Sequence, residues 1–236
     1  MTPHLQFRRH AESYERYNIV QTQVAQALVE KIPGPFEGIV DLGCGSGGFF
    51  RAYKYPYANY LAIDIAPEML ARHPDGEGIE KWVGDFDDPV LFDALAEREF
   101  DLLVSSSALQ WAKDLDWTLA CIASLGRPVA LAIFTDGTFR SLREVTGSTS
   151  PIRSREATEE LLRRHFDVEI DILRYELYFD DTLAMLRYIK RSGVSGGRRL
   201  LDYAGTKKLL ADYPLSYLEF EVVRAVSREI DSIINT

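Results

Sequence analysis

The sequence is poor in cysteine and has no long apolar run. Only two of its 236 residues are cysteines, Cys44 and Cys121, which are too few for a disulfide framework and typical of a reducing compartment. The longest clear apolar run, Val129 to Phe134, is far shorter than the roughly 20 residues that span a bilayer. No apolar stretch follows the arginines near the N-terminus, so a secretory signal is not expected. These absences predict a soluble cytoplasmic protein without a membrane partner.

Positive charge and histidine are also scarce. The 27 Lys and Arg residues against 36 Asp and Glu residues give a net charge of −9, which argues against a general nucleic-acid-binding surface. The 4 histidines show no metal-ligand spacing and no obvious pairing of a nucleophile with a base. Hydrolase and metalloenzyme chemistry are therefore disfavoured, and no metal is expected.

Short apolar runs alternate with helical segments through the first part of the chain. Strands are predicted at 38–42, 60–63, 81–83, 100–104 and 129–134, with helices at 11–32, 49–54 and 67–72 and further helical segments between the later strands. The runs are continuously apolar, as strands covered on both faces require. The pattern predicts βαβ crossovers and an α/β, Rossmann-like, doubly wound and mostly parallel sheet.

The pattern changes after residue 150. An amphipathic helix at 154–164 is followed by an alternating strand at 167–179, helices at 183–190 and 198–212, and a last strand at 215–226. This order predicts an antiparallel C-terminal edge with a helical lid insertion at 181–213. The chain 1–236 is expected to be one domain with a seven-stranded sheet, and its N-terminal segment 1–35 is expected to close over the ligand site.

A glycine-rich segment lies between the first predicted strand and the following helix. Gly43, Gly45 and Gly48 match the pattern G-x-G-x-x-G. Glycine there lets the chain turn and lets a ligand approach the backbone at a helix N-terminus. Asp64 follows about twenty residues later, at the end of the next strand, where a carboxylate can accept hydrogen bonds from a ribose. These residues predict a nucleoside-binding site.

Three kinds of nucleotide site compete for this pattern. A P-loop is disfavoured because Gly48 is followed by Phe49 and Phe50, where a P-loop has Lys and then Ser or Thr. A nicotinamide dehydrogenase fits the glycines and Asp64 but gives no role to Asp85, at the end of the third strand. A methyltransferase uses both carboxylates, because S-adenosylmethionine lacks phosphate and presents a ribose, an adenine amino group and apolar adenine faces.

Three motifs in order resemble those of class I S-adenosylmethionine-dependent methyltransferases. They are Val40–Gly47, Ile63–Leu70 and Gly84–Phe86. The resemblance implies that the glycines pass close to the methionine part of the cofactor, that Asp64 holds its ribose, and that Asp85 with Phe86 contacts its adenine. The residues expected at the cofactor site are Asp41, Gly43, Cys44, Gly45, Asp64, Ile65, Met69, Asp85, Phe86, Ser105 and Gln21.

Segments along nearly the whole chain also resemble the malonyl-acyl-carrier-protein O-methyltransferase family of biotin synthesis. They include 7–14, 106–111, 134–144, 186–193 and 214–217. The resemblance implies methyl transfer from S-adenosylmethionine to the free carboxylate of malonyl-phosphopantetheine on acyl carrier protein. The chain departs from the family between its second and third strands and over 195–212, which leaves the contacts with the carrier open.

The implied chemistry needs positioning more than proton transfer. A carboxylic acid with a pKa of about 4 is roughly a thousandfold ionised at pH 7, so a general base adds little. Arg140 and Arg143, just beyond the fifth strand, are candidates for orienting the substrate carboxylate, although each is equally well explained as a solvated helix residue. Tyr14 and Gln21 are candidates for closing over the cofactor from the N-terminal helix.

The predicted lid is basic although the chain as a whole is acidic. Between residues 184 and 212, seven Lys and Arg residues and two Asp residues give a local charge of +5. Because acyl carrier proteins are strongly acidic, this favours a docking surface near Arg187, Lys190, Arg191, Arg198 and Arg199. A solvated helix face is the alternative explanation for this charge. Three other functions also stay open for the protein: a methyltransferase with another small-molecule acceptor, a nicotinamide dehydrogenase, and a non-catalytic protein that binds S-adenosylmethionine.

Overall fold

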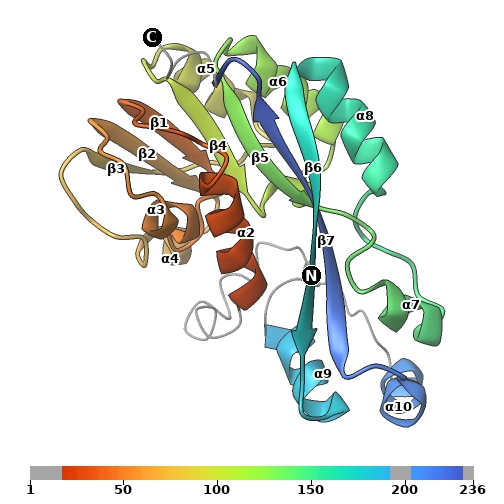
Figure 1. The fold of residues 1–236 in the computed structure, drawn as a ribbon. Coiled ribbons are helices and arrows are strands. Elements are labelled where there is room, and N and C mark those ends of the chain that lie inside the picture. The colour runs from red at the N-terminus through yellow and green to blue at the C-terminus, as the bar shows by residue number, and fades with distance from the viewer. Residues whose placement is uncertain (1–17, 192–202, 231–236) are drawn as a thin grey trace.

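One mixed sheet organises the part of the chain that the computed structural model describes, residues 18–191 and 203–230 (Figure 1). Its strand order is β3-β2-β1-β4-β5-β7-β6. The strands are β1 (Gly38–Leu42), β2 (Asn59–Asp64), β3 (Ile79–Val83), β4 (Leu102–Ser106), β5 (Val129–Phe134), β6 (Val168–Tyr178) and β7 (Tyr217–Ser227).

The five strands from β3 to β5 are parallel, and β7 runs antiparallel to both β5 and β6. Every residue of β1 and of β5 is buried, which explains why both read as continuous apolar runs. The predicted α/β, Rossmann-like sheet with an antiparallel C-terminal edge is confirmed.

Helices cover both faces of the sheet. Residues of β1 alternate between two apolar clusters. Ile39 packs in one cluster with Val24 and Leu28, whereas Val40 packs in the other with Leu95 and Leu119. The helices are α2 (Ile19–Val29), α3 (Gly48–Ala52), α4 (Pro67–Leu70), α5 (Pro89–Ala96), α6 (Leu115–Ser124), α7 (Arg140–Thr146), α8 (Arg155–His165), α9 (Thr182–Arg191), α10 (Tyr203–Asp212) and the 3₁₀ turn η1 (Leu109–Trp111).

Side chains fix where several of these helices begin. Asp88 accepts a hydrogen bond from the Val90 backbone at the start of α5, and Asp114 and Ser154 do the same for α6 and α8. Of the predicted helices at 11–32 and 198–212, residues 11–17 and 198–202 lie outside the described residues.

The fourth strand lies two residues further along the chain than predicted. The pattern suggested 100–104 for the fourth strand, but β4 spans Leu102–Ser106. Ser105 and Ser106 belong to the sheet because they pair with Leu131 and Ala132 of β5. Apolar patterning favoured Phe100 as a strand residue, but Phe100 lies before the strand. Its backbone is close to Gly38, where a Cβ would lie 2.8 Å from the Phe100 Cα.

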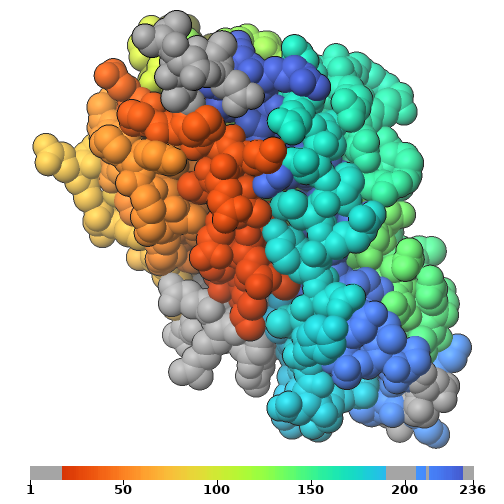
Figure 2. Space-filling model, viewed as in Figure 1, coloured from red at the N-terminus to blue at the C-terminus, as the bar shows by residue number. Residues whose placement is uncertain are grey.

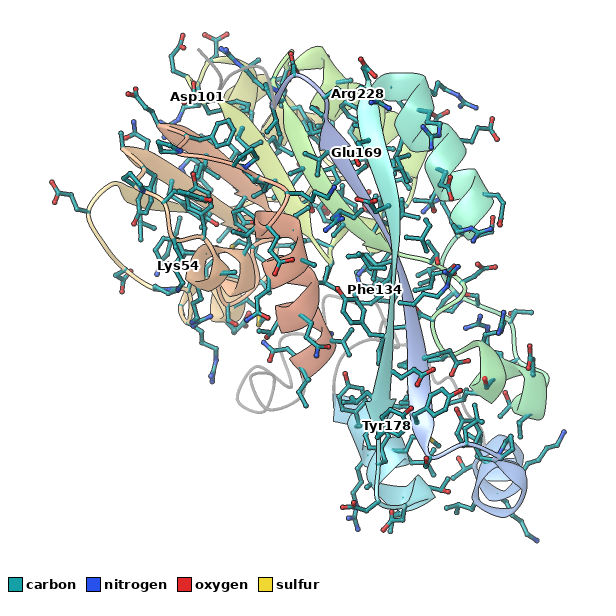
Figure 3. All side chains as sticks on the ribbon, viewed as in Figure 1. Lys54, Asp101, Phe134, Glu169, Tyr178 and Arg228 are labelled. Carbon is teal, nitrogen blue, oxygen red and sulfur yellow. The ribbon has the colours of Figure 1, made fainter. Side chains whose placement is uncertain are left out.

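The two C-terminal strands extend beyond the rest of the sheet. β5 pairs with β7 only over Val222–Val226, whereas β6 and β7 remain paired as far as Tyr178 and Tyr217. The extra length, residues 174–178 and 217–221, forms a two-stranded ribbon at the carboxyl edge of the sheet. Figure 3 shows Phe134 level with the middle of this strand pair and Tyr178 toward its far end.

The predicted helical insertion is carried by this ribbon. α9 and α10 follow β6 and precede β7 (Figure 1). Met185, Tyr188 and Ile189 of α9 are buried in the same apolar cluster as Leu218 and Phe220 of β7. On the face shown in Figure 2, α2 lies beside β6, with α9 below them. None of the helices described is long and apolar enough to span a membrane.

Candidate active site

The turn after β1 can be made only by glycine at its first position. Gly43 has φ of +77°, and a Cβ there would lie 2.3 Å from the Cβ of Ala108. The amides of Gly43 and Cys44 both donate to the Ile63 carbonyl, at 2.8 and 2.9 Å, which ties the turn to β2. Gly45 also has positive φ, at +55°. The backbone therefore approaches the space above the strand ends without an intervening side chain.

Asp64 connects this turn to the end of β2. Its Oδ2 accepts a hydrogen bond from the Gly45 amide at 2.9 Å, and its Oδ1 accepts one from the Ala66 amide at 2.8 Å. Asp64 thus both shapes the glycine turn and presents charge to whatever lies above it.

A hollow that is partly open to solvent lies over the carboxyl ends of β1 to β4. Open α/β sheets bind nucleotides and similar ligands at such strand ends. Its lining residues come from α2, the glycine turn and the ends of β2, β3 and β4: Asn18, Gln21, Thr22, Ala25, Asp41, Gly43, Cys44, Gly45, Ser46, Gly48, Phe49, Asp64, Ile65, Met69, Gly84, Phe86, Ser106, Ser107, Ala108 and Trp111.

The charge of this lining is negative. Asp41 and Asp64 are its charged side chains, and the described lining contains no Lys, Arg or His. Asp41 is buried, with 1% of its surface exposed, and its Oδ2 accepts a hydrogen bond from the Tyr60 hydroxyl at 2.7 Å. Burial raises the pKa of Asp41 to about 7, the Tyr60 hydrogen bond opposes that rise, and the charge of Asp64 adds to it.

Several buried polar atoms at the hollow have no hydrogen-bond partner among the described residues. They are Asp41 Oδ1, Gln21 Oε1 and Ser107 Oγ. Ser107 is also held at a φ of +66°, in the left-handed region that non-glycine residues rarely adopt. Buried acceptors are normally satisfied, so these atoms fit a ligand that brings donors. Together with the negative lining, they suit a cationic ligand such as S-adenosylmethionine.

Most of the predicted cofactor residues meet at this hollow. Asp41, Gly43, Cys44, Gly45, Asp64, Ile65, Met69, Phe86 and Gln21 all line it. Asp85 and Ser105 do not. Ser105 is fully buried and its hydroxyl donates to the Leu42 carbonyl at 2.7 Å, while Asp85 Oδ1 accepts a hydrogen bond from the Asp87 amide at 2.9 Å. Adenine recognition by Asp85 therefore stays a prediction.

Sequence reasoning missed part of the lining. Ser106 is the last residue of β4, Ser107 and Ala108 follow it, and Trp111 ends the 3₁₀ turn after them. The residue type of Trp111 favours a core position, because it is large and apolar. The signal that could have found these residues is their position directly after a buried parallel strand, at the same edge as the glycine turn.

The structure separates the two candidate arginines. Arg143 is half-buried, donates to the Thr138 and Asp136 carbonyls, and so holds the loop between β5 and α7. Burial lowers the pKa of its guanidinium. Arg140 is 72% exposed and lies 3.6 Å from the Glu144 carboxylate. Neither lines the hollow, and Tyr14 lies outside the described residues.

The predicted carrier-docking residues are described only in part. Arg187 is an exposed residue of α9. Lys190 and Arg191 belong to the same helix, but their side chains lie outside the description, as do Arg198 and Arg199 altogether. In the described residues no group of three or more His, Cys, Asp or Glu side chains could hold a metal ion.

Comparison with known proteins identifies the class. A family model described as a methyltransferase domain matches residues 40–134. The malonyl-[acyl-carrier protein] O-methyltransferase of Chlorobium luteolum is 31% identical over 237 residues, covering 92% of this chain and 88% of that protein. The one from Anoxybacillus flavithermus is 25% identical and covers 93% and 91%. The YcgJ protein of Bacillus subtilis shares the fold, with a TM-score of 0.59 at 12% identity, over 88% of this chain and 99% of that one.

The sheet, the glycine turn, the acidic hollow and these matches define a class I S-adenosylmethionine-dependent methyltransferase. This finding decides against the nicotinamide dehydrogenase that the glycine pattern alone left open. Within the class, the chain belongs to the family of the malonyl-[acyl-carrier protein] O-methyltransferases, whose members it matches along most of its length.

Proposed function

We propose that this enzyme methylates the free carboxylate of malonyl-acyl carrier protein. A carboxylate oxygen would form a bond to the methyl carbon as the bond from that carbon to sulfur breaks, giving the methyl ester and S-adenosylhomocysteine. The observation that carries the proposal is the 31% identity to a malonyl-[acyl-carrier protein] O-methyltransferase along 92% of this chain. This reaction would serve an early step of biotin synthesis.

The described residues at the strand ends support an assignment of each part of the cofactor to a different set of side chains. Asp64 would accept hydrogen bonds from the ribose, because its carboxylate already lies at the end of β2 beside the glycine turn. Ile65 and Phe86 would cover the faces of the adenine. Gly43 and Gly45 would admit the methionine part close to the backbone. Bound S-adenosylmethionine supplies an electrophilic methyl group on a positively charged sulfur.

The remaining work of the protein is alignment. The malonyl carboxylate is ionised at pH 7, so no side chain needs to remove a proton from it. Holding the oxygen, the methyl carbon and the sulfur in line can lower the barrier by about 7–11 kcal/mol. The neutral and acidic lining supports this picture, because the cofactor's own positive charge provides the attraction for the carboxylate.

Arg140 is the better of the two arginines for orienting the acceptor. Arg143 is committed to two backbone carbonyls, whereas the exposed pair of Arg140 with Glu144 costs little to break. A charge-assisted bond from Arg140 would contribute about 1.5–3 kcal/mol. Arg140→Gln would then raise the KM for the acceptor by roughly 10- to 150-fold, and the matched change Arg163→Gln on α8 would not.

Docking of the acyl carrier protein would use the basic side of the lid. Arg187, Lys207 and Lys208 are exposed on α9 and α10 and suit an acidic partner. The triple change of these residues to Glu should raise the KM for malonyl-acyl carrier protein more than the KM for malonyl-coenzyme A. Equal effects on both acceptors would remove the docking surface from the proposal.

The decisive experiment measures methyl transfer from labelled S-adenosylmethionine to malonyl-acyl carrier protein, with acetyl-acyl carrier protein as the control. The proposal expects label on the malonyl form alone, in a linkage that esterases release as methanol. Intact cofactor binding without label on either carrier would contradict the acceptor and direct the search to other small molecules.

A further inference from the structure

The Asp41 carboxylate accepts one hydrogen bond from the described residues, and that bond comes from Tyr60 of β2. The Tyr60 hydroxyl lies 2.7 Å from Asp41 Oδ2, and both side chains are buried. The Tyr60 ring is held between aromatic neighbours, with centroid distances of 5.0 Å to Phe50, 5.7 Å to Tyr57 and 5.8 Å to His73. The hydroxyl therefore has little freedom to leave the carboxylate.

This contact leaves the second carboxylate oxygen for the hollow. Asp41 lines the hollow, and its Oδ1 is buried without a partner. A desolvated carboxylate with one hydrogen bond gains strongly from a cation at its unpaired oxygen. In S-adenosylmethionine the groups that carry positive charge are the sulfonium and the α-ammonium.

We propose that Tyr60 is a positioning residue that holds Asp41 so that Oδ1 receives the α-ammonium of S-adenosylmethionine. The proposal depends on the cofactor of the class and not on the acceptor. It separates the cofactor's amino-acid end, held through Asp41 and Tyr60, from its nucleoside end, held through Asp64.

Few other charged groups face Asp41. Asp64 at the end of β2 raises its pKa, and Tyr60 lowers it through the hydrogen bond. Burial and the two nearby carboxylates keep the Cys44 thiol protonated by raising its pKa. His73 lies behind Tyr60, and burial lowers its pKa, which favours the neutral ring. Lys81 is paired with Asp75 at 2.7 Å.

The direction of the pH effect follows from these neighbours. In the ligand-free protein, Asp41 holds its proton below about pH 7 because its pKa is raised to that value. A cation requires the ionised form, so each unit of pH below that value weakens S-adenosylmethionine binding about tenfold. Above that value the affinity becomes independent of this group.

The test compares two ligands by calorimetric titration of the full chain between pH 5.5 and 8.5. S-Adenosylmethionine carries the α-ammonium, whereas 5′-methylthioadenosine keeps the nucleoside and lacks the amino-acid end. The wild-type enzyme is expected to bind the first more tightly as the pH rises, to release a proton countable in buffers of different ionisation enthalpy, and to bind the second independently of pH.

Tyr60→Phe removes the hydroxyl and keeps the ring. It should weaken S-adenosylmethionine on the order of tenfold, move the pH midpoint upward, and leave 5′-methylthioadenosine unchanged. Tyr57→Phe is the matched control in the same aromatic cluster and should behave as wild type. Asp41→Asn keeps an acceptor for Tyr60 and should abolish the pH dependence, which provides a second route if Tyr60→Phe does not fold.

Two results would overturn the proposal. One is equal weakening of both ligands in Tyr60→Phe, which would show a general packing role. The other is wild-type binding of S-adenosylmethionine that neither varies with pH nor releases a proton. Because no acceptor is present in the titration, a failure here leaves the malonyl proposal intact, and a failure of methyl transfer to malonyl-acyl carrier protein leaves this one intact.

Discussion

Replacing Asp64 with Ala tests the nucleoside half of the cofactor site. The side chain accepts hydrogen bonds from the Gly45 and Ala66 amides and, in the proposed complex, from the ribose hydroxyls. A hydrogen bond to a charged group contributes about 1.5–3 kcal/mol, so the loss of even one ribose bond lowers affinity at least about tenfold. The two backbone amides also lose their acceptor, which should lower the ligand-free Tm by several degrees.

Affinity and stability must be measured separately for this variant. Calorimetric titration gives the Kd for S-adenosylmethionine and for 5′-methylthioadenosine, and scanning calorimetry gives the ligand-free Tm. Because both ligands carry the ribose, Asp64→Ala should weaken them equally, in contrast to changes at Asp41 or Tyr60.

Asp101 offers a matched control. Its Oδ2 accepts a hydrogen bond from the Gly38 amide at 2.9 Å, so it too connects a carboxylate to the backbone of β1, but at the amino end of that strand (Figure 3). Asp101→Ala should cost stability without changing either Kd. Near-wild-type affinity of Asp64→Ala, or a loss confined to S-adenosylmethionine, would refute the assignment of Asp64 to the ribose.

Three further changes probe the surrounding structure. Gly43→Ala forces a Cβ to within 2.3 Å of the Cβ of Ala108 at positive φ and should destabilise the protein by about 2–5 kcal/mol in denaturant unfolding, whereas Gly48→Ala, with nothing within 4 Å, should not. The pKa of Asp41 is raised from 3.8 to about 7 in the folded state, so the folded state binds the proton more tightly than the unfolded chain does. The stability of the ligand-free protein should therefore fall as the pH rises from about 4 to 7. Asp41→Asn should remove that fall from the curve of Tm against pH. Arg143→Met should lower the Tm by several degrees because two carbonyls lose their donor, and an unchanged Tm would contradict its role in holding the loop.

Apolar patterning located the strands where burial alone decides the structure. β5 has the predicted bounds, Val129–Phe134, because every residue in it is buried and apolar. The fourth strand was displaced because Ser105 is polar yet fully buried. Its hydroxyl is satisfied by the Leu42 carbonyl of β1, a partner 63 residues away in the sequence. Such a tertiary hydrogen bond leaves no periodic signal in the sequence.

Residues on the cofactor side of the hollow could be predicted because local backbone geometry determines their residue types. Residues such as Gly43 and Asp64 are required by local geometry, positive φ in one case and a strand-end carboxylate in the other. The wall formed by Ser107 and Trp111 depends on how the chain turns after β4, and neither residue type indicates that turn. The commitment of Arg143 to backbone carbonyls was likewise set by the loop around it.

The ribbon formed by the outer lengths of β6 and β7 is separate in sequence from the part of the chain that carries the cofactor site. The methyltransferase domain model ends at residue 134, the last residue of β5, and the ribbon with α9 and α10 lies entirely beyond it. The ribbon continues the two strands at one edge of the sheet, and β7 pairs this edge with β5. The ribbon contributes none of the described residues that line the hollow. A chimaera joined at residues 174 and 221, where the paired ribbon begins, should therefore keep its affinity for S-adenosylmethionine, because every described residue that lines the hollow precedes residue 174.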